Sequence, residues 1–315
     1  MGAVSPPQLA AAVSEAGALG MVGTARPGGS TLSGVEVLVQ HAAQLTAKPF
    51  GVNFLVPPMS RPNLDLAAVA LAARSARVVE FFYGWPEREL IDLVHQGGAL
   101  VSWQIGSREE AVAAADLGCD VIVAQCLAAG GHVRGTIGLA ALLAEVLPAV
   151  DVPVLASGGI GDARAIVGAL AMGASGVRMG TRFVATPEAN AHPIYLEQLI
   201  AARASDAVYT EVFSATWPNA PHRCLRSCIE AANASSDEIV GDRRALDGSR
   251  VPVPRFGAGV TDADTRGNIA AMSLWAGESV GAVSCVQPAA EIVRELALEV
   301  DALLERWTAT QSSSA

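Results

Sequence analysis

Short, uniformly apolar segments alternate along the first 180 residues with longer segments in which apolar positions recur at helical spacing. The short segments are apolar at consecutive rather than alternate positions, which is typical of parallel strands covered on both faces. We predict seven strands, over residues 19–23, 50–55, 78–82, 99–103, 121–125, 153–157 and 176–180. The amphipathic segments predict helices over residues 7–16, 35–46, 64–75, 86–96, 107–117 and 162–172.

This repeat of strand and helix predicts a TIM barrel, in which eight parallel strands are each followed by a helix. Seven predicted strands are one short, and the chain enters at Met1–Val4 on the loop that leads into the first helix. We therefore expect an α/β fold, a TIM (β/α)8 barrel that lacks most of its first strand. Either that strand precedes Met1, or Met1–Val4 is a stub in an open barrel. We favour the first alternative, because a missing strand leaves two unpaired edges.

The rest of the chain is too long for a single closing helix. Residues 193–203 have a helical pattern, residues 205–265 are irregular, and residues 288–307 form a long amphipathic segment. We expect three units: the barrel over residues 1–190, a mainly helical insertion or lid over residues 191–270, and a return to the barrel with its closing C-terminal helix over residues 271–315.

The composition of the chain excludes several classes of binding partner. Of 315 residues, 51% are hydrophobic and 17% are charged, so the chain can bury a large core. A formal net charge of −10 and a single lysine, Lys48, leave no basic face for nucleic acid or an anionic bilayer. No apolar segment reaches the roughly 18 residues of a transmembrane helix, and the five cysteines lack paired spacing. We predict a cytoplasmic protein without nucleic-acid or membrane partners.

The C-terminal ends of the strands form the active site in TIM barrels. Here the residues at those ends are, with one exception, uncharged: Gly23, Asn53, Glu80, Tyr83, Trp103, Gln104, Gln125, Ser157, Gly158, Gly159, Gly180 and Thr181. Lys48 precedes its strand, which argues against a Schiff-base lysine. HRCLRSC (His222–Cys228) lacks a fourth metal ligand, so we expect no metal site. Amides, hydroxyls and glycines favour an organic cofactor bound by backbone and amide hydrogen bonds.

Two glycine-containing turns follow the last two predicted strands, within ASGGIGDARAIVGALAMGASGVRMGTRF (Ala156–Phe183). The corresponding loops of many TIM barrels bind phosphate through backbone N–H groups. Gly158–Gly159 and Gly180–Thr181 allow the backbone to approach an anion closely. We expect a phosphate group of the cofactor here, and two ordinary tight turns are the alternative.

A histidine follows two glycines in AQCLAAGGHVRG (residues 124–135), directly after a predicted strand. The glycines let the loop run close to a cofactor, and a neutral imidazole there can donate a hydrogen bond or accept a proton. His132 is therefore the candidate catalytic residue. Glu80 and Tyr83 could also serve as acid–base groups, but their aromatic neighbours equally indicate a packed cofactor wall.

The chain resembles the nitronate monooxygenase family, formerly called 2-nitropropane dioxygenases, in four segments: GVNFLVP, AQCLAAGGHVRG, PVLASGGIGDARAIVGALAMGASGVRMGTRF and WPNAPHRCLRS. The resemblance implies an FMN-binding TIM barrel with an insertion. The expected cofactor contacts are Met1, Gly2, Asn53, Gln125, Gly131, Ser157, Gly158, Gly159, Gly180, Thr181 and Gly277. Two departures stand out: Cys126 replaces a common glycine, and Val133 separates the GGH sequence from Arg134.

The resemblance also implies an activity, the oxidation of alkyl nitronates by FMN and O2 to a carbonyl compound and nitrite. His132 then faces the substrate over the flavin as a base or a hydrogen-bond partner. Two alternatives stay open: an NAD(P)H-dependent enoyl-ACP or quinone reductase of the same barrel, and a non-catalytic flavin- or phosphate-binding barrel. The expected partners are a small nitronate and O2, and a homodimer is compatible with the sequence.

Overall fold

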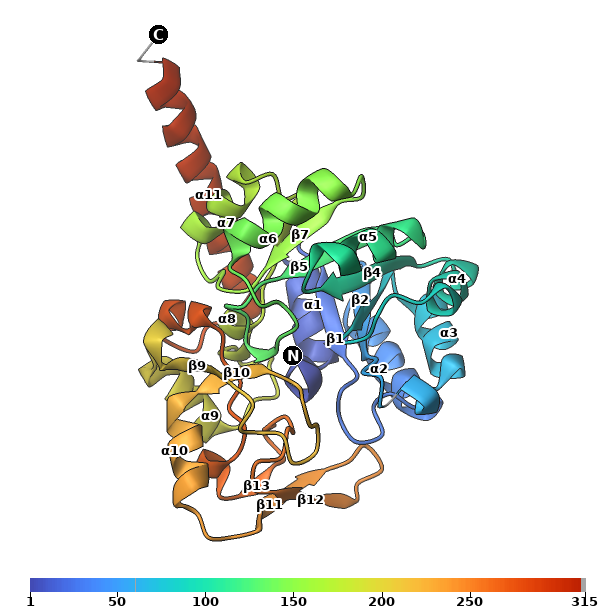
Figure 1. Ribbon diagram of the computed structural model, residues 1–315, viewed down its shortest axis with the longest axis vertical. Helices are drawn as coiled ribbons and strands as arrows, with labels where there is room; N and C mark the ends of the chain where they lie inside the picture. The colour runs from blue at the N-terminus through green and yellow to red at the C-terminus, as the bar shows by residue number, and fades with distance from the viewer. Residues whose placement is uncertain (60, 313–315) are drawn as a thin grey trace.

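The core of the molecule is a sheet of seven parallel strands in the computed structural model, which describes residues 1–59 and 61–312. The strands follow one another in the order β1-β2-β3-β4-β5-β7-β8 (Figure 1). They are β1 (Gly20–Gly23), β2 (Phe50–Leu55), β3 (Val78–Phe82), β4 (Leu100–Ile105), β5 (Val121–Gln125), β7 (Val154–Ser157) and β8 (Gly176–Arg178). Each strand begins and ends within two residues of its predicted range, so the predicted strand order is confirmed.

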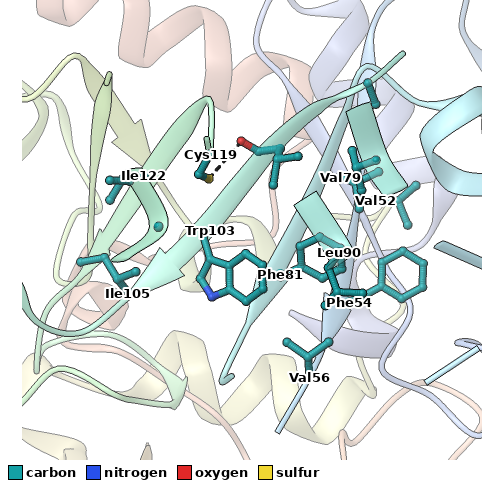
Figure 2. Packing of buried hydrophobic residues seen from close by; sticks show 14 of the residues in the cluster. Val52, Phe54, Val56, Val79, Phe81, Leu90, Trp103, Ile105, Cys119 and Ile122 are labelled. Atoms are coloured by element: carbon teal, nitrogen blue, oxygen red, sulfur yellow. Dashed lines mark hydrogen bonds between the residues drawn. The ribbon is translucent and has the colours of Figure 1, made fainter. Parts of the chain in front are cut away.

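The strand interiors are buried because helices cover the outside of the sheet and side chains fill the inside. All five residues of β3 are buried. On neighbouring strands, the ring of Phe81 lies 4.9 Å from that of Trp103 and 6.2 Å from that of Phe54 (Figure 2). The Trp103 indole N–H donates to the carbonyl oxygen of Gly84 at 3.0 Å, so burial leaves this polar group paired. Burial on both faces explains why these segments are apolar throughout.

Helices separate the strands, and several begin at a residue that caps the first turn. They are α1 (Pro7–Glu15), α2 (Leu32–Leu45), α3 (Leu66–Ser75), α4 (Arg88–Gly97), α5 (Arg108–Asp116), α6 (Leu139–Val146), α7 (Ala163–Ala171) and α8 (Thr181–Val184). Side-chain oxygens of Thr31, Asp65, Ser107 and Asp162 accept first-turn backbone N–H groups. Helix α6 was not predicted, because LAALLAEV is apolar almost throughout and shows no helical period.

Strands β1 and β8 are the two edges of the sheet, and neither pairs with a further strand within the described residues. Met1–Val4 does not form a strand stub, because Gly2–Val4 is a 3-10 helix, η1. A cavity of about 650 Å³ opens between the edges and is lined in part by apolar side chains of α1 and of α11 (Ala289–Ser312). The predicted barrel with an incomplete set of strands is thus confirmed.

Helix α11 packs against the barrel as the predicted closing helix. Its residues Ala289 and Ile292 share a buried cluster with Leu9 of α1 and Phe183 of α8. The helix then extends away from the barrel (Figure 1). Residues 313–315 of the predicted third unit lie outside the described residues. No helix in the described part of the chain is both long and apolar enough to cross a membrane.

The segment over residues 191–270 is a mixed unit of helices and strands, whereas a mainly helical one was expected. Its elements are α9 (Pro193–Ala201), β9 (Ala207–Thr210), β10 (His222–Leu225), α10 (Arg226–Ala234), β11 (Ile239–Arg244), β12 (Arg250–Pro254) and β13 (Arg266–Gly267). Together with β6 (Gly131–His132), the strands form antiparallel sheets in the orders β6-β10-β9 and β12-β11-β13. These strands are short and interrupted by Pro, Gly and Arg, as in RVPVP of β12, which hides the alternating pattern.

Short 3-10 helices complete the connections: η2 (Arg61–Asn63), η3 (Leu147–Ala149), η4 (Ala204–Asp206), η5 (Ile269–Ala271) and η6 (Glu278–Ala282). The insertion occupies the lower part of Figure 1 and has its own buried core, which includes Phe213 and Val240. Strand β6 (Gly131–His132) leaves the barrel after β5 and pairs with β10, so that His132 lies opposite His222. The segment that carries the candidate catalytic histidine therefore forms a strand in a sheet of the insertion.

Candidate active site

A cavity of about 420 Å³ lies where the C-terminal ends of the barrel strands meet the insertion. The predicted site residues that line it are Met1, Gly2, Asn53, Gln125, Gly131, His132, Ser157, Gly158, Gly159, Gly180 and Thr181. Gly277 does not line the cavity. Its backbone N–H donates to Thr181 Oγ1 at 3.0 Å, and a Cβ added to it would lie 2.7 Å from the Gly130 nitrogen. Gly277 therefore allows two loops to pack tightly behind the cavity wall, and its predicted cofactor contact stays a prediction.

The turn after β7 has the geometry of an anion cradle. Gly158 and Gly159 have φ values of 105° and 74°, in the left-handed region that favours glycine. A Cβ on Gly158 would lie 2.7 Å from Cys126 Sγ. Across the described residues, the backbone N–H groups of Gly158, Gly159 and Gly180 donate to no protein acceptor. Unpaired N–H groups beside a cavity fit the phosphate of an organic cofactor.

Cys126, beside this turn, and Cys119, just before β5, are buried thiols. Cys126 Sγ donates to the Gly158 carbonyl oxygen at 3.6 Å, and burial raises the pKa of this thiol. Burial also raises the pKa of Cys119 to about 12. Both thiols are therefore protonated at neutral pH, which makes them poor nucleophiles.

Inside the barrel, Glu80 forms a buried ion pair with Arg178. Glu80 Oε1 lies 2.8 Å from Arg178 Nη2, and Oε2 lies 3.3 Å from Nε. Asn53 Nδ2 donates to Glu80 Oε1 at 2.9 Å. Glu80 is thus occupied in charge pairing and in positioning Asn53. Arg178, which the sequence analysis did not single out, lines the cavity and adds a positive charge there.

Gln125 fixes the loop that carries His132. Its Nε2 donates to the His132 carbonyl oxygen at 3.0 Å, and its Oε1 accepts the Arg134 backbone N–H at 3.2 Å. The intervening Val133 is buried, and its N–H donates to the Pro221 carbonyl oxygen at 2.8 Å. The additional residue in the GGH loop therefore ties this loop to the insertion. The predicted flavin contact of Gln125 stays a prediction beside this positioning role.

The His132 ring lies in an aromatic enclosure to which the barrel, the insertion and the segment returning to the barrel each contribute a ring. It stacks on Trp217, with ring centroids 4.0 Å apart and an interplanar angle of 27°. The rings of Trp275 and Tyr83 lie 5.3 Å and 5.8 Å from it. His132 Nε2 is buried and has no hydrogen-bond partner in the described structure. Because buried polar atoms are rarely left unpaired, this nitrogen is the atom best suited to meet a ligand.

His132 is neutral in this environment. Burial, and to a lesser degree the neighbouring His222, lowers the pKa of His132 to about 3. His222 Nε2 accepts the Phe213 N–H at 3.2 Å, so its proton resides on Nδ1, which faces the Ala220 carbonyl oxygen at 2.9 Å. A neutral His132 can donate a hydrogen bond to an anion, but it is a weak proton acceptor. The described residues contain no cluster of three or more side chains able to hold a metal.

Tyr83 belongs to the cavity's aromatic surroundings. Its φ of 74° is unusual for a non-glycine residue and orients its ring toward His132 and Trp217. Burial raises the pKa of Tyr83 to about 12, so its hydroxyl stays protonated at neutral pH. These features favour a packed wall over an acid–base role.

Sequence reasoning also missed several lining residues with large side chains, among them Arg26, Trp217, Arg243 and Trp275. Trp217 lies within the segment WPNAPHRCLRS, but no periodic pattern indicated where its ring points. Arg243 lies on β11, a strand that was not predicted. One signal in the sequence could have indicated these residues: Trp and Arg side chains occur in an irregular segment that was expected to cover the barrel mouth.

Known proteins resemble this chain in sequence and in fold. The sequence pattern of the nitronate monooxygenase family matches residues 1–299. Nitronate monooxygenase of Pseudomonas aeruginosa is 31% identical over 342 aligned positions, which cover 94% of this chain and 93% of that protein. An octahydroindene carboxyl-CoA dehydrogenase of Rhodococcus jostii is 34% identical over 247 positions, which cover 78% of this chain and 65% of the relative.

Two solved structures extend the comparison to the whole fold. FabK from Thermotoga maritima superposes with a TM-score of 0.79 at 28% identity, and the match covers 98% of this chain and 93% of that one. Nitroalkane oxidase from Streptomyces ansochromogenes superposes with a TM-score of 0.74 at 28% identity, covering 97% and 95%.

Proposed function

Because the chain belongs to the nitronate monooxygenase family, a family of flavin-dependent oxidoreductases, we propose that it oxidises alkyl nitronates with O2, using FMN, to a carbonyl compound and nitrite. One observation carries this proposal. A neutral histidine with a buried, unpaired Nε2 lines the same cavity that contains the glycine turns suited to a phosphate. Such a cavity can hold a flavin and a small anion together.

We assign the FMN phosphate to the backbone at the two glycine turns, where unpaired N–H groups can donate to it. The residues are Gly158, Gly159, Gly180 and Thr181. The isoalloxazine ring and ribityl chain are assigned to Met1, Gly2, Asn53, Gln125, Gly131 and Ser157. When bound, FMN accepts electrons from the substrate and passes them to O2. The protein supplies binding, orientation and exclusion of water.

His132 is assigned the recognition of the nitronate. A nitronate is an anion, and a neutral imidazole can donate an N–H to its oxygen without first taking up a proton. The pKa of about 3 makes His132 a weak base at neutral pH, so we favour the hydrogen-bond role over abstraction of a proton from a nitroalkane. The stacked Trp217 holds the ring in place and keeps water away from it.

The variants His132→Ala and His132→Asn test this role. We expect FMN content to be unchanged and kcat/KM for ethyl nitronate to fall about a hundredfold in His132→Ala, the typical effect of losing one hydrogen-bond donor to a reacting anion. His132→Asn retains an N–H donor and is expected to recover part of the loss. Equal activity of His132→Ala and the native protein would remove His132 from the mechanism.

The test of the function itself is anaerobic mixing of the yellow protein with ethyl nitronate while the flavin absorbance is followed. We expect the oxidised-flavin band to bleach and to return when O2 is admitted, with nitrite as a product. A band that does not change would contradict nitronate oxidation.

A second candidate function is supported by the superposition on FabK, which is at least as good as that on nitroalkane oxidase. In this alternative, NAD(P)H reduces the flavin of a reductase. Rapid anaerobic bleaching by NADH or NADPH, without bleaching by ethyl nitronate, would favour the reductase. A protein that takes up no flavin at all would instead favour the non-catalytic barrel.

A further inference from the structure

Two arginines that line the active-site cavity have no side-chain partner among the described residues. Arg26 follows β1, and Arg243 lies on β11 of the insertion. The Nε atom of each is buried without a hydrogen-bond partner, and neither guanidinium forms an ion pair with a described residue. By contrast, Arg134, Arg178 and Arg223 donate to carboxylates or backbone carbonyl oxygens.

Leaving two guanidinium groups unpaired is costly for the protein. Both side chains are partly exposed, but each has a buried Nε donor without an acceptor, and an unsatisfied buried donor destabilises the folded state. Partners are not scarce, because the chain has 31 acidic residues against 21 basic ones. The buried Asp262 lies beyond ion-pair distance of Arg243. Burial lowers the pKa of Arg243, and the charge of Asp262 only partly opposes this effect. Unpaired arginines beside a cavity in an acidic protein therefore indicate that a ligand supplies the anion.

The local backbone makes room for these two side chains. A Cβ on Gly259 would lie 2.7 Å from Arg243 Nη1, and a Cβ on Gly29 would lie 2.6 Å from Arg26 Cγ. The two segments are also joined, since the Leu246 N–H donates to the Pro27 carbonyl oxygen at 3.2 Å. The arginines thus come from adjoining segments, which differ from the loops after β7 and β8 that carry the glycine turns.

We propose that Arg26 and Arg243 form an anion subsite that binds a carboxylate or phosphate group of the substrate, separate from the reacting group at His132. The planar guanidinium donates two parallel hydrogen bonds to either kind of anion. As an account of substrate recognition, the subsite rests on the proposed function. It predicts that preferred substrates carry an anionic tail beyond the carbon that the flavin oxidises.

The test measures binding to the oxidised, FMN-loaded protein by titration calorimetry, without turnover. The probes are propionate for a carboxylate, inorganic pyrophosphate for a phosphate, and propionamide as the uncharged control. We expect the native protein to bind one of the two anions. The anion that binds more tightly shows whether the subsite recognises a carboxylate or a phosphate group. Arg26→Gln and Arg243→Gln should each weaken that binding about tenfold, as expected for loss of a charge-assisted hydrogen bond.

Arg244→Gln is the matched control, because Arg244 is the exposed neighbour of Arg243 on the same strand and does not line the cavity. It should bind the anion like the native protein. Failure of the native protein to bind either anion, or equal binding by all variants, would overturn the subsite. Loss of FMN from Arg26→Gln or Arg243→Gln would also overturn it and assign the arginines to the cofactor. Anion binding without nitronate oxidation would retain the subsite and reject the proposed activity.

Discussion

The barrel and the insertion contribute to the active site in different ways. The barrel supplies mainly backbone groups and amides at strand ends, such as the turn at Gly158 and the side chain of Asn53. The insertion supplies bulky or charged side chains, including Trp217 and Arg243. Backbone cradles suit a constant cofactor, whereas side chains on a covering unit can vary with the substrate. This difference implies that mutations in the two regions should affect separate measurements.

The largest effect is expected in the barrel, from Gly158→Ala. The new Cβ would lie 2.7 Å from Cys126 Sγ at a φ of 105°, so the turn must change shape. We expect FMN affinity to fall about a hundredfold, measured by flavin fluorescence, because the strain and the displaced N–H groups together cost a few kcal/mol. Gly118→Ala is the control: Gly118 has a φ of 93° but no atom near its Cβ position. If both variants kept full FMN affinity, the cradle assignment would be wrong.

A smaller effect is expected in the insertion, from Trp217→Ala. Removing the stacked indole exposes the His132 ring, so its pKa should rise from about 3 toward its ordinary 6.5. FMN affinity should stay unchanged, while KM for ethyl nitronate should rise about tenfold, the upper range for loss of one aromatic pair. NMR titration of the His132 imidazole gives the pKa directly. Trp85→Ala, at an exposed tryptophan of the barrel, should change neither quantity. An unchanged His132 pKa in Trp217→Ala would show that the insertion does not control this ring.

The same two regions differ in how far the sequence predicts them. The barrel residues Asn53 and Gly158 could be placed because each follows a continuous apolar segment, and strand ends meet at one face of a TIM barrel. The insertion offered no such rule, because its strands are short and pair across long stretches of chain. The stacking of His132 on Trp217 joins segments that are far apart in sequence.

Within the barrel itself, local patterns also had limits. Arg178 and Glu80 lie 98 positions apart, and only the curvature of the sheet brings their side chains together. Gly277 was expected at the cofactor from the family resemblance; it packs against Gly130 behind the cavity wall, and its cofactor contact stays a prediction. Position along a strand is a local property, whereas pairing across the barrel interior depends on the closed shape of the fold.

The smallest expected effect is the contribution of the buried His132 to the pH dependence of the free energy of unfolding. Its folded-state pKa of about 3 lies below the ordinary 6.5, so the unfolded chain binds a proton that the folded protein excludes between these values. Stability is therefore complete above pH 6.5 and is lost as the pH falls toward 3. From pH 6.5 to 5.5, His132 alone should lower the free energy of unfolding by about 1 kcal/mol. Urea unfolding of the native protein and of His132→Asn, in the same state of flavin loading, isolates this contribution, because other buried histidines contribute equally to both. Parallel pH profiles for the two proteins would mean that the insertion leaves His132 open to water.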